Sequence, residues 1–169
     1  QAEITGLAEI FTLTPAASPN APTVLIPQGA VWRFLDTGTN LGTAWTALSF
    51  PDTNWSSGAA QLGFGDGDEI SQVASNRQVT TYFRHTFTVA NPAAFSNLTV
   101  ALLRDDGGIV YLNGTEVFRS NIRAGTVDYL TLATNALAAD ETTLFYTNVI
   151  SPTSLVAGRF RSPIFAVPI

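Results

Sequence analysis

The chain has 169 residues, a net charge of −5 and 12% charged residues, and all eight of its cations are arginine. This length fits one domain with a core of its own, and the charge balance lacks the basic surface that nucleic-acid binding requires. Cysteine is absent, which excludes disulfides, thiolate metal sites and a cysteine nucleophile, and no apolar run approaches the roughly 20 residues of a membrane-spanning helix.

The first predicted strand lies near the N-terminus and is set apart from the rest of the chain. It covers residues 8–14 (AEIFTLT), and the Pro- and Ala-rich segment 14–22 that follows is typical of a tether. Further short strands are predicted at 23–26 (TVLI) and 31–35 (VWRFL). Turn-forming residues dominate 36–76, which is therefore predicted to be mostly loop.

The middle of the chain carries the clearest strand patterns. Residues 80–89 (TTYFRHTFTV) alternate between an apolar and a polar face. Residues 97–103 (NLTVALL) have no polar face, which is typical of a central strand that is covered on both sides. The apolar face of 80–89 consists of Phe83, His85, Phe87 and Val89, and the polar face of Tyr82, Arg84, Thr86 and Thr88.

A β-hairpin is predicted over residues 108–119. Its turn is Asn113-Gly114, a dipeptide that favours the type I′ geometry because both residues accept a positive φ. Asp105 and Asp106 precede it in a turn relieved by glycine. With two more predicted strands at 126–133 and 143–150, the many short strands and turns indicate an all-β sandwich or barrel.

Five motifs follow one another along the chain in a recognisable order. They are VWRFLDTGTNLGTAW (31–45), FPDTNWSSGAAQLGFGDGDE (50–69), TTYFRHTFTV (80–89), LLRDDGGIVYLNGTEVFRSN (102–121) and DETTLFYTNVISPTSLVAG (140–158). This series resembles a galactose-binding-like jelly-roll module of secreted bacterial proteins, and it is similar to the sugar-binding domain of family-two glycoside hydrolases. The resemblance implies a jelly-roll β-sandwich of two antiparallel sheets and a non-catalytic role in carbohydrate or cell-surface binding.

The C-terminal end departs from the family pattern. Family members continue after LVAG with an apolar strand and a closing strand, whereas this chain has RFRSPIFAVPI at 159–169. Pro163 and Pro168 argue against a central strand there, because proline cannot donate a hydrogen bond to a strand ladder. We therefore expect the last strand to be altered or missing, which would leave unpaired backbone groups and an apolar groove.

The N-terminal strand is a candidate to fill such a groove. It can fold back onto its own domain, or it can complete the sheet of a neighbouring subunit and join copies head to tail. Both arrangements remain open. The residues expected at a subunit contact are Leu7, Ile10, Phe11, Leu13, Ile164 and Phe165.

Aromatic side chains are the main candidates for sugar binding. The C–H groups of a pyranose pack against an aromatic ring, and polar neighbours bind its hydroxyl groups. At least two of the three tryptophans are expected to be structural. The residues assigned to carbohydrate binding are Trp45, Trp55, Tyr82, Arg84 and Arg104.

The acidic stretch FGDGDE (64–69) is a candidate calcium site. Asp66, Asp68 and Glu69 offer the oxygen ligands that Ca²⁺ prefers, although the stretch does not match the twelve-residue calcium loop. The resemblance implies a structural calcium, which galactose-binding-like modules often carry, and a solvated loop is the alternative. No other cofactor is expected.

The sequence argues against an enzyme. Asp105 and Asp106 are adjacent, so in an extended chain they point to opposite sides and cannot face one substrate together. His85 is the only histidine, and no Gly-x-Ser-x-Gly elbow is present.

Two functions from different classes follow. The first is a secreted module for a polysaccharide or a cell-surface glycan, and the second is a self-assembling subunit of an extracellular filament or surface layer joined by strand donation. The expected organisation is an N-terminal strand (1–13), a tether with a short strand (14–27) and the β-sandwich (28–169). Secretion is expected because the chain has no methionine, as in a mature protein without its signal peptide, although a trimmed chain would look the same.

Overall fold

A computed structural model describes residues 4–7, 9–15, 22–65, 67–75, 78–136, 144–155 and 158–167. The fold is all-β, as predicted, and the helical segments in these ranges are the short 3-10 turns η1 (Ala44–Thr46), η2 (Pro92–Ala94) and η3 (Pro152–Ser154). No helix in the described ranges has the length and apolarity to cross a membrane. The strands are β1 (Ile4–Leu7), β2 (Glu9–Pro15), β3 (Thr23–Ile26), β4 (Val31–Leu35), β5 (Ser56–Ala59), β6 (Leu62–Phe64), β7 (Ser71–Gln72), β8 (Thr81–Val89), β9 (Phe95–Leu103), β10 (Gly107–Leu112), β11 (Thr115–Ser120), β12 (Phe145–Ile150) and β13 (Gly158–Val167).

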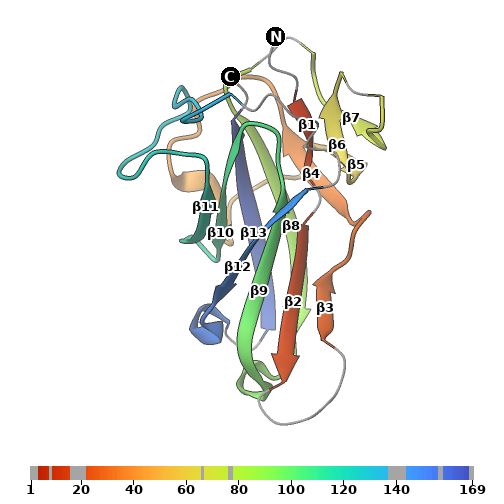
Figure 1. The fold of residues 1–169 in the computed structure, drawn as a ribbon, viewed down its shortest axis with the longest axis vertical. Helices are drawn as coiled ribbons and strands as arrows, with labels where there is room; N and C mark the ends of the chain where they lie inside the picture. Colours follow the sequence, from red (N-terminus) through yellow and green to blue (C-terminus); the bar gives the residue numbers. More distant parts are fainter. Residues whose placement is uncertain are drawn as a thin grey trace.

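Two antiparallel sheets lie face to face. A four-stranded sheet has the order β12-β9-β2-β3, and a six-stranded sheet has the order β11-β10-β13-β8-β4-β5. Figure 1 shows β9 and β2 of the first sheet lying across β13 and β8 of the second. The predicted strands at 23–26, 31–35, 80–89 and 97–103 are confirmed to within two residues.

A third, small sheet is the first departure from the expected architecture. It has the order β1-β6-β7, and β6 and β7 run parallel. The expectation of two antiparallel sheets therefore describes only the two larger ones. Strands β5, β6 and β7 also arise inside 36–76, which was predicted to be mostly loop. They were missed because strands of two to four residues are too short to show an alternating pattern.

The N-terminal strand pairs within its own chain in this structure. Strand β2 lies between β9 and β3, with register pairs that run from Glu9↔Leu102 to Pro15↔Phe95 on the β9 side. The expected subunit-contact residues accordingly have backbone register partners in the same chain. These backbone partners are Leu62 for Leu7, Ala101 for Ile10, Val100 for Phe11, Leu98 for Leu13, Phe83 for Ile164 and Tyr82 for Phe165.

The last strand is present, and the expectation that no central strand forms at the C-terminal end is wrong. Strand β13 is ten residues long and lies in the interior of the six-stranded sheet, between β10 and β8. Pro163 is tolerated because the described pairing with β10 stops at Ile164, so that β13 has only β8 beside it at position 163. Pro168 lies outside the described residues.

The core between the two larger sheets is built by alternating side chains from both. Phe83, Phe87 and Val89 of β8 point into it, and β9 contributes Leu98 and Val100. These side chains are all buried, as strand alternation predicts for the apolar face of 80–89. His85 is the exception on this face, since it is only partly buried.

The opposite face of β8 is also buried, which the sequence pattern did not indicate. Tyr82 and Arg84 were assigned to a polar face, yet their exposed fractions are both 2%. Loops cover this side of the sheet and form a second apolar cluster with it. The cluster consists of Trp45, Tyr82, Ile109, Ile122 and Ala133, with partly buried neighbours that include Trp55, Tyr111, Val127 and Tyr129.

The hairpin prediction is confirmed and the strand prediction at 126–133 is wrong. Asn113 and Gly114 have φ of 51° and 88° between β10 and β11, as a type I′ turn requires. Residues 126–133 instead form a loop in which Thr131 and Ala133 are buried against the sheet. Their alternating pattern reflects this burial without a partner strand.

The single histidine is partly buried beside the core. Its Nδ1 lies 2.9 Å from the Val31 carbonyl oxygen, and its ring centroid lies 5.0 Å from that of Trp32. Burial lowers the pKa of His85, and the hydrogen bond to Val31 raises it in smaller measure.

The lowered pKa of His85 predicts a loss of stability on mild acidification. In the unfolded chain His85 takes up a proton near pH 6.5, whereas in the folded protein it stays neutral to lower pH. The contribution of neutral His85 to the free energy of unfolding is therefore complete above about pH 6.5 and is lost as the pH falls below it. Urea unfolding of the wild type and His85→Gln should show a smaller decrease for the variant between about pH 7.5 and about pH 5.5. An equal decrease in both proteins would contradict the lowered pKa.

Candidate functional site

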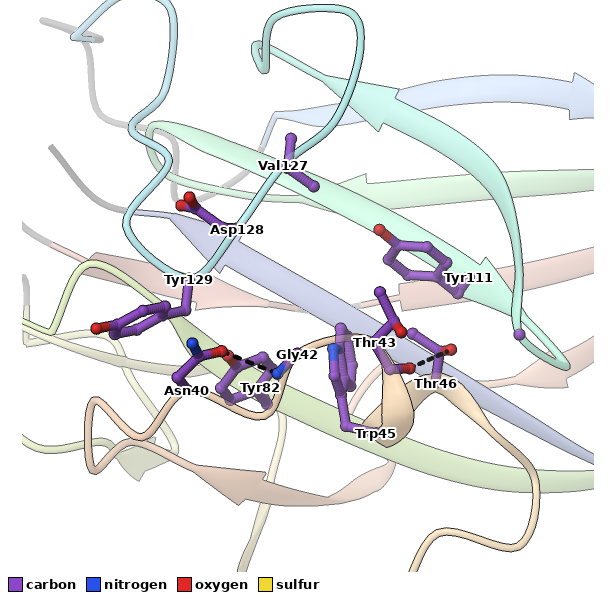
Figure 2. Close-up of a pocket in the computed structure, with 11 residues that line it drawn as sticks. Asn40, Gly42, Thr43, Trp45, Thr46, Tyr82, Tyr111, Val127, Asp128 and Tyr129 are labelled. Atoms are coloured by element: carbon purple, nitrogen blue, oxygen red, sulfur yellow. Dashed lines mark hydrogen bonds between the residues drawn. The ribbon is translucent and has the colours of Figure 1, made fainter.

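A cavity of about 280 Å³ lies on the loop-covered face of the six-stranded sheet. Its walls come from η1 and the preceding loop, from β8 and β10, and from the loop after β11. Figure 2 shows Tyr111 and Val127 on one side of it and Trp45, Thr43 and Thr46 on the other. The lining residues are Asn40, Gly42, Thr43, Trp45, Thr46, Tyr82, Tyr111, Gly114, Val127, Asp128 and Tyr129.

Aromatic rings form much of the cavity wall. The Trp45 ring centroid lies 4.8 Å from that of Tyr82 and 5.7 Å from that of Tyr111, with interplanar angles of 60° and 79°. These are tilted and edge-to-face arrangements, which the ring quadrupoles favour. Trp45 is only 3% exposed, so its position is fixed by packing before any ligand arrives.

Burial keeps the tyrosine hydroxyl groups protonated. Burial raises the pKa of Tyr82. The hydrogen bond from the Leu41 N–H lowers this pKa in part, and the nearby Tyr129 and Asp128 raise it further. Burial likewise raises the pKa of Tyr111. Both phenols therefore remain neutral hydrogen-bonding groups across the physiological pH range.

A buried ion pair holds the η1 side of the cavity. Arg84 of β8 donates from Nε to Asp52 Oδ2 at 3.0 Å and from Nη2 to the Ala47 carbonyl oxygen at 2.9 Å. Its guanidinium carbon also lies 5.4 Å from the Phe50 ring centroid. Arg84 thus ties the segment that follows η1 to the central sheet, and this segment positions Trp45.

A hydrogen-bonded turn builds the other wall. Asp128 Oδ1 accepts from the Leu130 N–H at 2.9 Å and from the Thr131 hydroxyl at 3.2 Å, and the Thr131 N–H donates to the Asp128 carbonyl oxygen. The Tyr129 carbonyl oxygen accepts from the Thr80 hydroxyl next to β8, at 2.8 Å. These bonds fix Asp128 and Tyr129 at the edge of the cavity.

The structure brings together two of the five residues assigned to carbohydrate binding. Trp45 and Tyr82 both line the cavity. Trp55 packs beside it, with its ring centroid 6.4 Å from that of Tyr82. Arg84 belongs to the buried ion pair, so its basic group supports the loop instead of facing the cavity.

Arg104 lies away from the cavity and has a structural position. Its guanidinium donates to the carbonyl oxygens of Asp105 and Asp106 at 2.7 and 2.8 Å and to the Ser120 hydroxyl at 2.8 Å. It also stacks 3.8 Å from the Tyr146 ring centroid. The acidic turn before the hairpin is therefore organised by Arg104.

The calcium candidates are only partly described. Asp66 lies outside the described residues, and Glu69 Oε2 accepts from the Gly67 N–H at 3.0 Å. Asp68 is exposed. Within the described ranges, no three histidine, aspartate or glutamate side chains gather closely enough to hold a metal ion.

Sequence reasoning missed the wall after β11. Asp128 and Tyr129 were placed in a predicted strand, although the Asp-x-x-Thr spacing of residues 128–131 is typical of a turn closed by side-chain hydrogen bonds. That spacing could have identified a loop here. Asn40, Thr43 and Thr46 carry no comparable signal, because they meet the cavity only through the tertiary fold.

Comparisons with protein-family models, with curated proteins and with solved structures gave no match. The candidate site therefore rests on its own geometry.

The buried ion pair predicts a large difference between two substitutions. Asp52→Ala leaves the buried Arg84 guanidinium without its carboxylate and should lower the free energy of unfolding by about 3–5 kcal/mol. The matched control is Arg33→Ala, because Arg33 lies 3.9 Å from the same carboxylate but is 44% exposed in its side chain; it should cost less than about 1 kcal/mol. Urea unfolding measures both, and equal losses would show that Arg84 does not depend on Asp52.

Proposed function

We propose that this protein is a non-catalytic, secreted jelly-roll module that binds carbohydrate in the aromatic cavity. The observation that carries the proposal is the cavity itself, in which buried Trp45 and Tyr82 and half-buried Tyr111 and Tyr129 meet polar groups. Aromatic faces next to hydroxyl and amide groups suit a pyranose, which has apolar C–H faces and a polar rim. The core shared by the two larger sheets supports the jelly-roll assignment.

The size of the cavity limits the ligand. Ligand sites span about 300–1,000 Å³, and the cavity volume of about 280 Å³ lies just below this range. The cavity therefore fits a single sugar ring, such as the terminal residue of a glycan, better than an extended chain segment.

The cavity wall gives a direct test of carbohydrate binding. Tyr129→Ala removes one aromatic wall and should weaken the binding of a glycan selected from an array by roughly 2- to 12-fold, as expected for an aromatic contact of about 0.5–1.5 kcal/mol. Leu130→Ala is the matched control, because Leu130 is the next residue, is exposed and does not line the cavity. Isothermal titration calorimetry measures both. Equal affinities, or no retained glycan in the array, would contradict the proposal.

A second candidate function is self-assembly by exchange of β2. Strand β2 occupies an interior place in its sheet, and its removal would separate β9 from β3. The same pairing formed by β2 of another copy would join chains without new contacts, as in domain swapping. The large share of the sheet ladder that β2 supplies favours this alternative.

A cysteine pair distinguishes exchange from pairing within one chain. Thr12 and Thr99 are register partners on β2 and β9, and directly opposed strand positions are close enough for a disulfide. The native chain has no cysteine, so only the introduced pair can react. Under mild oxidation, strand exchange predicts a ladder of covalently joined chains of T12C/T99C on a non-reducing gel. A monomer band with an internal disulfide would contradict it.

A further inference from the structure

The cavity has an uneven distribution of charge. Asp128 is the one charged side chain among the described residues that line it, and no arginine or histidine reaches it. Arg119 lowers the pKa of Tyr111 by its charge, but it is held by Glu116 through bonds of 2.8 and 2.7 Å, and it does not line the cavity. Asp128 is exposed, so a ligand in the cavity meets its carboxylate at the rim, and no cationic side chain is among the described lining residues.

The aromatic walls act in the same direction as the carboxylate. Trp45, Tyr82, Tyr111 and Tyr129 line the cavity, and the face of an aromatic ring carries the negative part of its quadrupole. Positively charged ammonium groups are attracted to such faces, with tryptophan the most favourable, and the attraction grows when water is excluded. Trp45 and Tyr82, both less than 4% exposed, form a buried wall of the cavity from which water is excluded.

Apart from Asp128, the hydrogen-bonding side chains that line the cavity are neutral amide and hydroxyl groups. The Thr46 hydroxyl donates to the Thr43 carbonyl oxygen at 2.9 Å, and Asn40 Oδ1 accepts from the Gly42 N–H at 2.9 Å. Asp128 is oriented by the Leu130 N–H and the Thr131 hydroxyl on one of its oxygens, Oδ1. A carboxylate or sulfate ligand would find no charged donor among these groups.

We propose that the preferred ligand carries a protonated amine, so that the cavity selects unacetylated amino sugars over neutral and acidic sugars. This inference rests on the proposed carbohydrate function and names its ligand class. The ammonium group lies against the aromatic rings with Asp128 as its counter-charge, and the sugar ring fills the remainder of the cavity. An acetylated amino sugar has the same ring but no positive charge. A uronic acid carries a negative charge instead.

Calorimetric titration with four compounds tests this selection: methyl glucosaminide, methyl N-acetylglucosaminide, methyl glucuronide and tetramethylammonium. At a pH where the amine is protonated, methyl glucosaminide should bind about 10-fold more tightly than its acetylated form, and the glucuronide should bind weakest. Tetramethylammonium should bind and compete with methyl glucosaminide.

Two charge-neutralising variants locate the effect. Asp128→Asn keeps the Oδ1 acceptor of the turn and should reduce the preference for the amine to about twofold or less. Asp68→Asn is the control, because it removes the same charge from an exposed residue that does not line the cavity, and it should leave the preference unchanged.

The outcomes separate the two proposals. Binding of the acetylated sugar as tightly as of the free amine would overturn the amine selection and leave carbohydrate binding standing. Binding of none of the three sugars would overturn the proposed function and the amino-sugar assignment with it. A preference that survives in Asp128→Asn would overturn the role of the carboxylate.

Discussion

Strand β8 has to bury side chains on both of its faces, and the rest of the structure follows from this constraint. Phe83 belongs to the core between the two larger sheets, whereas its neighbour Tyr82 belongs to the cluster on the opposite side. The four-stranded sheet covers only the first of these faces. The second face is covered by loops, and these loops have to be held in place without the ladder of hydrogen bonds that a further sheet would provide.

A buried ion pair and side-chain hydrogen bonds fix these loops in place. Arg84 reaches from β8 to Asp52 and to the Ala47 carbonyl oxygen, which fixes the segment around η1. On the other side, the Asp128–Thr131 turn is closed by its own side chains. Because two separately anchored loops do not close completely over the sheet, an aromatic cavity remains between them. In this fold the cavity is therefore a consequence of how the second face is covered.

The large strands could be predicted from the sequence because each has a pattern of its own. Thr23–Ile26 and Val31–Leu35 begin and end as predicted, and the Asn113-Gly114 turn fixes the hairpin register. The face assignment of Tyr82 and Arg84 could not be predicted, because a polar residue on a strand is usually exposed and only the tertiary partner Asp52 makes Arg84 tolerable in the interior. The strand prediction for residues 126–133 was wrong because their burial comes from tertiary contacts. Such burial gives the same alternating pattern as a strand. Of the candidate site, Trp45 and Tyr82 were identified from residue type, while the wall formed by Asp128 and Tyr129 depended on a loop path that no local pattern reveals.

Loops fold over the second face of the six-stranded sheet and enclose a preformed aromatic cavity. Nuclear Overhauser effects between ring protons test this arrangement most directly, because they report ring proximity in the ligand-free protein. We expect cross-peaks from the Trp45 indole to the rings of both Tyr82 and Tyr111, whose centroids lie 4.8 and 5.7 Å away. A folded protein in which the Trp45 indole shows no cross-peak to either tyrosine would contradict it.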